Sequence, residues 1–321
     1  MKDPQGQDGQ AGLTSINTRT GRNMPQAIAT GAALVILIVL CLLARPDAFM
    51  FLIVVFMTLG LWELRVDFAT AGLYIPVVAL WLGSAGTMLA MFYCKDHLGA
   101  MTAGVLLTAV IASLASGFQG QGGQRLERAV LGKTRLLQDG QRAGQSQRHA
   151  YNGYANMTVT LLTVLYITLL ACMIVLPTTF GEHPVAHGAM TVFLPAVSDI
   201  GGLFFGAFLG RHKLSPRISP KKSVEGLAGS MLSCVVAAGV IFVCTYPVRD
   251  LGRTWWVAIL LGAMVGVTGT FGDLSASLIK RDLGIKDMGH FLKGHGGVLD
   301  RVDSILMSAP FITLLLWFTG L

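Results

Sequence analysis

Long uninterrupted runs of apolar residues dominate this chain, with little of the alternation between apolar and polar positions that marks a soluble fold. There are nine such runs. Each is close to the roughly 20 residues that carry an α-helix across a hydrocarbon core about 30 Å thick. They lie near residues 26–44, 48–64, 72–94, 98–116, 156–176, 188–210, 226–247, 254–272 and 304–321. We therefore predict an all-α fold, a polytopic integral membrane protein with about nine transmembrane helices.

Polar stretches divide these runs into two groups. Residues 1–25 are rich in Gly, Gln and Asn, which is typical of a disordered tail. Residues 26–116 contain the first four runs, residues 117–155 are basic and polar, and residues 156–321 contain the other five. We expect a cytosolic tail, an N-terminal group of transmembrane helices, a basic cytosolic loop and a C-terminal transmembrane domain that carries the chemistry.

The basic residues favour one orientation in the membrane. With the N-terminus inside the cell, the inward segments contain 20 of the 24 Lys and Arg residues, and only Arg45, Lys95, Arg249 and Arg253 face outward. Membrane proteins concentrate Lys and Arg in their cytoplasmic loops, so this distribution predicts an N-in/C-out topology. The same bias explains the net charge of +7 without a nucleic-acid partner.

Composition agrees with this interpretation. The chain is 53% hydrophobic and only 13% charged, whereas soluble domains are about 25% charged. An ordinary soluble globular protein is excluded.

Two polar segments carry candidate chemistry. The first follows Ser198 and Asp199, which stand inside an apolar run, where an ionisable group normally faces a partner or a watery cavity. A polar contact between helices is the simpler alternative for this pair. Cations and hydroxyls come next, namely Arg211, His212, Lys213, Ser215, Ser219, Lys221, Lys222 and Ser223.

The second segment combines carboxylates with cations and glycines. Asp273 is predicted to end an apolar helix, and it precedes Lys280 by seven residues, about two turns, which puts both side chains on one face. Asp287, Asp300 and Asp303 flank a Gly-His-Gly-Gly turn. Such carboxylates suit Mg²⁺, which takes one or two of them together with substrate phosphates.

These residues resemble a known signature. From Ser277 the pattern S-x-I-K-R-x4-K-D-x-G-x2-L-x2-H-G-G-x2-D-R-x-D resembles that of the phosphatidate cytidylyltransferases, the CDP-diacylglycerol synthases. The upstream stretch SDIGGLFFGAFLGRHKLSPRISPKKSVEGLAGS is similar to that family's other block. Ile200, Val224 and Lys293 depart from the usual Thr, Trp and Pro or Gly, which bears on substrate preference more than on reaction type.

The resemblance implies transfer of a cytidylyl group from CTP to phosphatidate, giving CDP-diacylglycerol and pyrophosphate. It implies a magnesium-dependent enzyme in the inner or plasma membrane whose active site faces the cytoplasm. Whether a second, monovalent cation accompanies Mg²⁺ is left open. The resemblance also suggests a homodimer. The partners expected are CTP, phosphatidate and membrane lipid.

The roles that we assign on this basis are hypotheses. Lys222, Lys280 and Arg281 would neutralise the triphosphate and the departing pyrophosphate. The carboxylates that would hold Mg²⁺ are Asp273 and Asp300, supported by Asp303 and Asp199. The other candidate substrate-binding residues are Ser198, Lys213, Ser219, Lys221, Ser223, His295 and Arg301.

Three alternatives to this function make different predictions. A transporter would use Asp199 along an ion path, but it predicts inverted repeats, and the two halves show no convincing similarity. A lipid-binding scaffold would explain the basic loops through anionic headgroups, but not the paired aspartates around Gly-Gly. Within the enzyme class, transfer to another lipid phosphate stays open.

Overall fold

The computed structural model describes residues 24–117, 153–215, 218–285, 288 and 297–321. The first helices are α2 (Met24–Ala44), α3 (Pro46–Thr70), α4 (Val77–Tyr93) and α5 (His97–Gly117). The next span combines α8 (Gly153–Thr163), a π-helical turn (Val164–Leu169), α9 (Leu170–Val175) and a 3₁₀ turn (Leu176–Thr179). The last helices are α10 (Pro184–Leu209), α11 (Val224–Thr245), α12 (Val248–Asp282) and α13 (Leu299–Thr319).

The predicted helical membrane fold is confirmed. Within the described residues, seven helices are long and apolar enough to cross a membrane, and two shorter apolar helices accompany them. The count of nine spans and the N-in/C-out orientation stay predictions. Most of the predicted tail and of the 117–155 loop lies outside the described residues, so the domain boundaries also stay predictions.

One prediction about local structure was wrong. Asp273 does not end its helix, because α12 continues to Asp282 and places Lys280 and Arg281 in its last turn. Leu274 and Ala276 are buried in this extension, so packing against neighbours favours helix beyond the apolar run. Gly284 follows the C-terminal cap of α12, and its positive φ of 71° is a conformation that glycine adopts readily after a helix.

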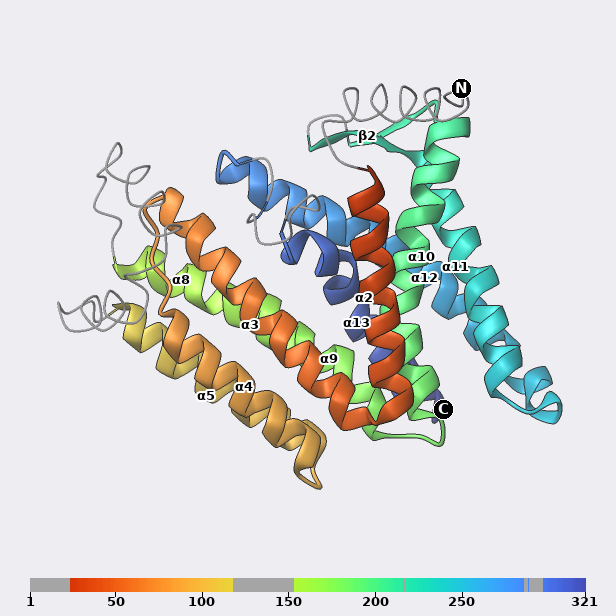
Figure 1. The fold of residues 1–321 in the computed structure, drawn as a ribbon, viewed down its shortest axis with the longest axis horizontal. Helices are drawn as coiled ribbons and strands as arrows, with labels where there is room; N and C mark the ends of the chain where they lie inside the picture. The colour runs from red at the N-terminus through yellow and green to blue at the C-terminus, as the bar shows by residue number, and fades with distance from the viewer. Residues whose placement is uncertain (1–23, 118–152, 216–217, 286–287, 289–296) are drawn as a thin grey trace, which may run out of the picture.

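The fold is not purely helical. The polar segment after α10 forms an antiparallel hairpin of β1 (Lys213–Ser215) and β2 (Ser219–Ser223), drawn above α10 in Figure 1. The Glu225 carboxylate accepts hydrogen bonds from the backbone N–H groups of Arg211 and His212 at 3.0 and 3.2 Å. Ser223 caps α11 by accepting from the Gly226 N–H at 3.1 Å. Both ends of the hairpin are therefore tied to the start of α11.

Glycines let the C-terminal helices approach one another closely. A Cβ atom on Gly262 or Gly266 of α12 would collide with the backbone of Val235 or Met231 on α11. A Cβ on Gly201 of α10 would collide with the α11 side chain of Ser233. Without a side chain at these positions, helix backbones in a membrane can pack in direct contact.

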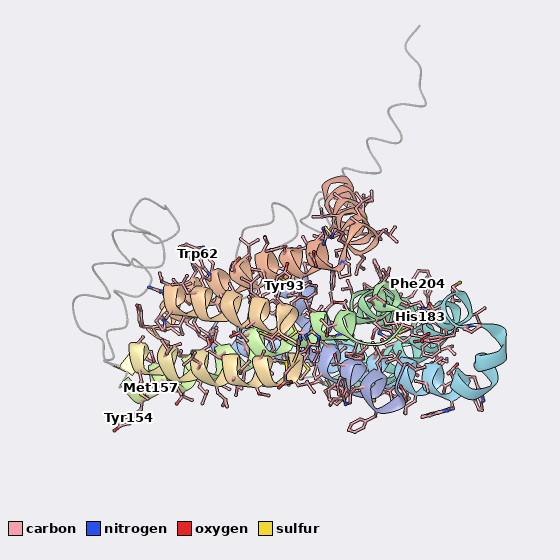
Figure 2. The ribbon with its side chains drawn as sticks, turned by 90° about the horizontal axis from the view of Figure 1, so that it is seen from below. Trp62, Tyr93, Tyr154, Met157, His183 and Phe204 are labelled. Carbon is pink, nitrogen blue, oxygen red and sulfur yellow. The ribbon has the colours of Figure 1, made fainter. Side chains whose placement is uncertain are left out.

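Two hydrophobic cores meet along α13. Its buried residues Leu306 and Ala309 join the core formed with α3 and α9, whereas Ile312 and Leu316 join the core of α10, α11 and α12. Figures 1 and 2 show α4, α5 and α8 on one side of the molecule and α11 and α12 on the other. Many large apolar side chains point outward, as Tyr154 does in Figure 2, which suits a lipid environment.

Candidate active site

A charged cavity of about 650 Å³ lies between the hairpin, the C-terminal half of α10 and the facing parts of α11, α12 and α13. Four carboxylates and three cations line it, namely Asp199, Asp273, Asp300, Asp303, Lys222, Lys280 and Arg301. Asp199 to Asp303 spans more than 100 residues of sequence, so the fold gathers these charges from separate segments. Convergent ionisable groups in a membrane protein are expected at a functional site.

Lys222 and Asp273 form the first ion pair of the cavity. The Lys222 Nζ lies 2.8 Å from Asp273 Oδ2 and donates to the Thr270 carbonyl oxygen at 3.0 Å. The lysine is the penultimate residue of β2, and the Ser223 cap that follows fixes the hairpin on α11. One ammonium group is thus held beside the cavity wall by two oxygens of α12.

Lys280 and Asp300 form the second ion pair. The Lys280 Nζ lies 2.9 Å from Asp300 Oδ1, and the second carboxylate oxygen accepts from the Met288 N–H at 3.1 Å. Both side chains are at most 15% exposed, so solvent screens this pair less than the first. The sequence predicted that Asp273 and Lys280 share a face of their helix, and both line the cavity.

Ser304 joins the remaining two carboxylates. Its hydroxyl donates to Asp199 Oδ1 at 3.1 Å and lies 3.5 Å from Asp303 Oδ1, which also accepts from the Ser304 N–H at 2.7 Å. Asp303 is buried. Two carboxylates from α10 and α13 therefore converge on one hydroxyl.

The other predicted residues divide into several groups. Ser219, Ser223 and Arg301 line the cavity, although the Ser223 hydroxyl is used as the helix cap. Lys213 is exposed on β1 and does not line it. The side chain of Lys221 and all of His295 lie outside the described residues.

Ser198 and Arg281 make contacts that differ from the predicted roles. The buried Ser198 hydroxyl donates to the Gly266 carbonyl at 3.4 Å, and the Ser198 carbonyl accepts from Ser230 at 2.7 Å. This is the polar contact between helices that was the simpler alternative. The Arg281 Nε donates to the Ile218 carbonyl at 2.6 Å, so its guanidinium supports the hairpin from the end of α12.

The carboxylates suit Mg²⁺ that is shared with a substrate. Within the part of the chain that the structure describes, no three His, Cys, Asp or Glu side chains form a group arranged to hold a metal ion by themselves. Mg²⁺ does not require such a group, because it is commonly bound by one or two carboxylates plus phosphate oxygens and water. The convergence of Asp199 and Asp303 on Ser304 meets this smaller requirement.

Two residues of this site were not identified from the sequence. Ser304 directly follows the Asp-Arg-x-Asp motif and could have been found by its place one residue after Asp303. Thr270 contributes only its backbone carbonyl, for which no residue-type signal exists. Outside the cavity, Glu63 of α3 was also not identified, and it contacts the start of α13 from the N-terminal half of the chain.

Comparison with known proteins identifies the family. The sequence profile of the cytidylyltransferase family matches residues 25–319. The chain belongs to this family. The match includes the N-terminal helices as well as the two polar segments, so it covers more of the chain than the resemblance seen in the sequence.

Two mycobacterial relatives named for this activity agree with the family, and a third relative is uncharacterized. The chain is 31% identical over 302 residues to the phosphatidate cytidylyltransferase of Mycobacterium leprae, covering 92% of this chain and 88% of the relative. It is 32% identical over 300 residues to that of Mycobacterium tuberculosis strain H37Rv, covering 91% and 82%. It is also 38% identical over 154 residues to the uncharacterized protein YnbB of Escherichia coli, covering 47% and 49%.

The predicted family and enzyme class are thereby confirmed, and the protein is a nucleotidyltransferase. Membership in an enzyme family argues against the transporter and the scaffold. The roles of individual residues and the magnesium ion stay predictions.

Proposed function

We propose that this protein transfers a cytidylyl group from CTP to phosphatidate, giving CDP-diacylglycerol and pyrophosphate. The observation that carries the proposal is the cavity in which Lys222 and Lys280 stand beside four carboxylates. The names of the mycobacterial relatives support phosphatidate as the acceptor.

The chemistry is consistent with these residues. A lipid phosphate monoester is largely a dianion near neutral pH, because its second pKa is about 6, so the acceptor oxygen needs no general base. That oxygen attacks the α-phosphorus of CTP, a P–O bond forms, and the bond from the α-phosphorus to the pyrophosphate oxygen breaks. The obstacle is repulsion between anions, and catalysis rests on positioning and charge neutralisation.

Each polar group has a defined part in this scheme. Lys222 and Lys280 exchange their present carboxylate partners for phosphate oxygens and neutralise the triphosphate and the leaving pyrophosphate. Arg301 presents a fork of N–H donors toward a phosphate. Mg²⁺, held by Asp273 and Asp300 with support from Asp199 and Asp303, would reduce the repulsion between the phosphates. A second, monovalent cation would act in the same way.

The location follows from the two substrates. CTP is water-soluble and phosphatidate is a lipid, so the cavity must open at a membrane surface. The concentration of Lys and Arg in the predicted inward segments supports the cytoplasmic face of a cell membrane. A reporter fused after Leu321 should then lie outside and one inserted near Gln141 inside. Finding both on one side would contradict the N-in/C-out topology.

One assay tests the function. Purified protein in detergent is given labelled CTP, with and without phosphatidate and Mg²⁺, and is scored for CDP-lipid and pyrophosphate. We expect both products in equal amounts, only with all components present. A panel of other lipid phosphates provides the control for acceptor identity. Faster transfer to another member of the panel would retain cytidylyl transfer and replace phosphatidate, and no nucleotide-lipid with any acceptor would contradict the proposal.

A further inference from the structure

Glu63 is a buried carboxylate far in sequence from the charged cavity. It lies on α3 and is 2% exposed. Its two oxygens accept separate hydrogen bonds, from the Val298 N–H at 2.8 Å and from the Leu299 N–H at 2.9 Å. These amides lie 235 and 236 residues further along the chain, at the first residue of α13 and the residue before it.

This contact supplies a cap that α13 lacks. The first amides of a helix have no partner within the helix, and a side-chain oxygen usually accepts from one of them. The residue at the cap position is Val298, whose side chain cannot accept a hydrogen bond. Glu63 replaces the missing cap from another helix, and its negative charge is also stabilised by the positive end of the helix dipole.

Packing around the carboxylate fits this role. Gly60 lies one turn before Glu63, and a Cβ on Gly60 would lie 3.8 Å from a Leu299 methyl group. A Cβ on Gly297 would come within 2.8 Å of Glu63 Oε2 and would collide with the Met288 carbonyl. At Gly60 a side chain would make only an ordinary van der Waals contact, so it is the missing side chain of Gly297 that lets the backbone reach the carboxylate.

The capped residues lead directly into the charged cavity. Leu299 is followed by Asp300, whose oxygens hold Lys280 and the Met288 N–H, and then by Arg301 and Asp303. We propose that Glu63 is a positioning residue, which from α3 holds the first turn of α13 so that Asp300 reaches Lys280. Its effect on rate rests on the cytidylyl transfer proposed above, but its contact with α13 does not.

Two substitutions separate charge from geometry. Glu63→Gln keeps the size but offers one acceptor oxygen and an NH₂ group that faces an N–H donor, so one hydrogen bond is lost. Glu63→Asp keeps the charge and both oxygens but is shorter by one methylene. The control is Glu182→Gln, which makes the same chemical change at an exposed residue between the 3₁₀ turn and α10.

Three measurements are made on full-length protein in detergent, namely hydrogen exchange by mass spectrometry, the thermal midpoint, and kcat and KM for CTP. In Glu63→Gln we expect faster exchange confined to peptides covering 297–303. We also expect kcat to fall by roughly 10- to 100-fold, since a displacement of about 1 Å can have that effect, with KM for CTP little changed. Glu63→Asp should recover part of kcat, and Glu182→Gln should match the wild type.

The outcomes are distinct. Wild-type exchange in 297–303 for Glu63→Gln would overturn the contact, whether or not the wild type makes CDP-lipid. Faster local exchange with unchanged kcat would overturn the positioning role and leave a structural cap. Failure of both Glu63 variants to fold, while Glu182→Gln folds, would also assign Glu63 to the fold alone. If the wild type transfers no cytidylyl group, the exchange data still decide the contact.

Discussion

Two cavities of similar size in this protein have opposite linings. One, of about 710 Å³, lies between α4 and α5 and is lined by residues such as Val77, Leu82, Leu107 and Ile111. The other is the charged cavity of about 650 Å³. Within the lining of the α4–α5 cavity no residue is ionised at neutral pH.

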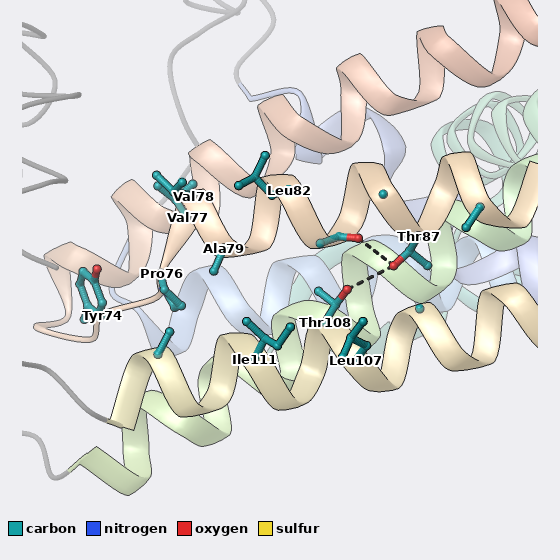
Figure 3. Close-up of a pocket in the computed structure, with 15 residues that line it drawn as sticks. Tyr74, Pro76, Val77, Val78, Ala79, Leu82, Thr87, Leu107, Thr108 and Ile111 are labelled. Carbon is teal, nitrogen blue, oxygen red and sulfur yellow. Dashed lines mark hydrogen bonds between the residues drawn. The ribbon is translucent and has the colours of Figure 1, made fainter.

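Two threonine hydroxyls of the α4–α5 cavity are engaged in contacts between its own residues. The Thr87 hydroxyl donates to the Gly83 carbonyl at 2.7 Å and lies 3.2 Å from the Thr108 hydroxyl. Figure 3 marks the contact between Thr87 and Thr108 with a dashed line. A Cβ on Gly83 would collide with Thr108, and one on Gly104 would collide with Thr87. The hydroxyls therefore serve the packing of α4 on α5.

Volume alone therefore does not distinguish a functional site in this protein. In the charged cavity ionisable groups from four segments, α10, β2, α12 and α13, line the wall, and two of its carboxylates hold cations that phosphates could bind instead. Substitutions in each cavity test this contrast.

The largest effect is expected for Asp273→Asn and Asp300→Asn. Each keeps the shape of the side chain and removes one charge, so the protein should purify normally but lose nearly all transfer. Initial rate against Mg²⁺ concentration, at saturating CTP and phosphatidate, measures this. Asp47→Asn is the matched control, because Asp47 pairs with Arg45 at 2.7 Å at the start of α3. Wild-type Mg²⁺ curves for both cavity variants would refute the metal assignment.

A strong but smaller effect is expected for Lys222→Ala and Lys280→Ala. Each removes a charge-assisted contact to phosphate of about 1.5 to 3 kcal/mol, which corresponds to roughly a 10- to 150-fold loss in kcat/KM. Lys280→Arg should not restore the rate fully, because a planar guanidinium does not replace a point charge. Steady-state kinetics with CTP varied measure the effect, with the exposed Lys95→Ala as control. Normal kinetics in both variants would indicate that these lysines contribute only to the concentration of positive charge on the cytoplasmic side.

A moderate effect is expected for Arg281→Ala. The Arg281 guanidinium is exposed and holds the Ile218 carbonyl, so its loss should loosen the hairpin that carries Lys222. One hydrogen bond of about 0.5 to 1.5 kcal/mol corresponds to roughly a 2- to 10-fold rise in KM for CTP, with kcat maintained. The same kinetics measure it. A loss of kcat as large as that of Lys280→Ala would restore the role in phosphate neutralisation predicted from the sequence.

The smallest effect is expected for Thr108→Val in the α4–α5 cavity. The change keeps the shape and removes one of two paired hydroxyls, so the thermal midpoint should fall modestly and the transfer rate should stay within about 2-fold of wild type. A rate assay and a thermal melt of the same preparation provide both values. A large loss of rate without loss of stability would show that the apolar cavity takes part in the reaction.

The local pattern of apolar residues was sufficient to predict most of the helices. Apolar runs located the helices because burial in lipid requires about 20 consecutive apolar residues, whatever the rest of the chain does. Helix ends were less predictable, since α12 extends to Asp282 through packing of Leu274 and Ala276 that no local run reveals. Glu63 carries a signal of its own, because it is an ionisable residue within an apolar run, but no local pattern identifies its partners 235 and 236 residues away.

By itself the sequence determined the membrane class, the two polar segments and the family resemblance, because each rests on neighbours along the chain. The sequence correctly placed Asp273 and Lys280 on one helix face, but the tertiary structure paired Asp273 with Lys222 of β2 and Lys280 with Asp300 of α13. It also brought Glu63 to the amides of Val298 and Leu299. Spacing along a helix sets the direction of a side chain, whereas its partner depends on how closely the helices pack, and here that packing is set by glycines and buried side chains from distant segments.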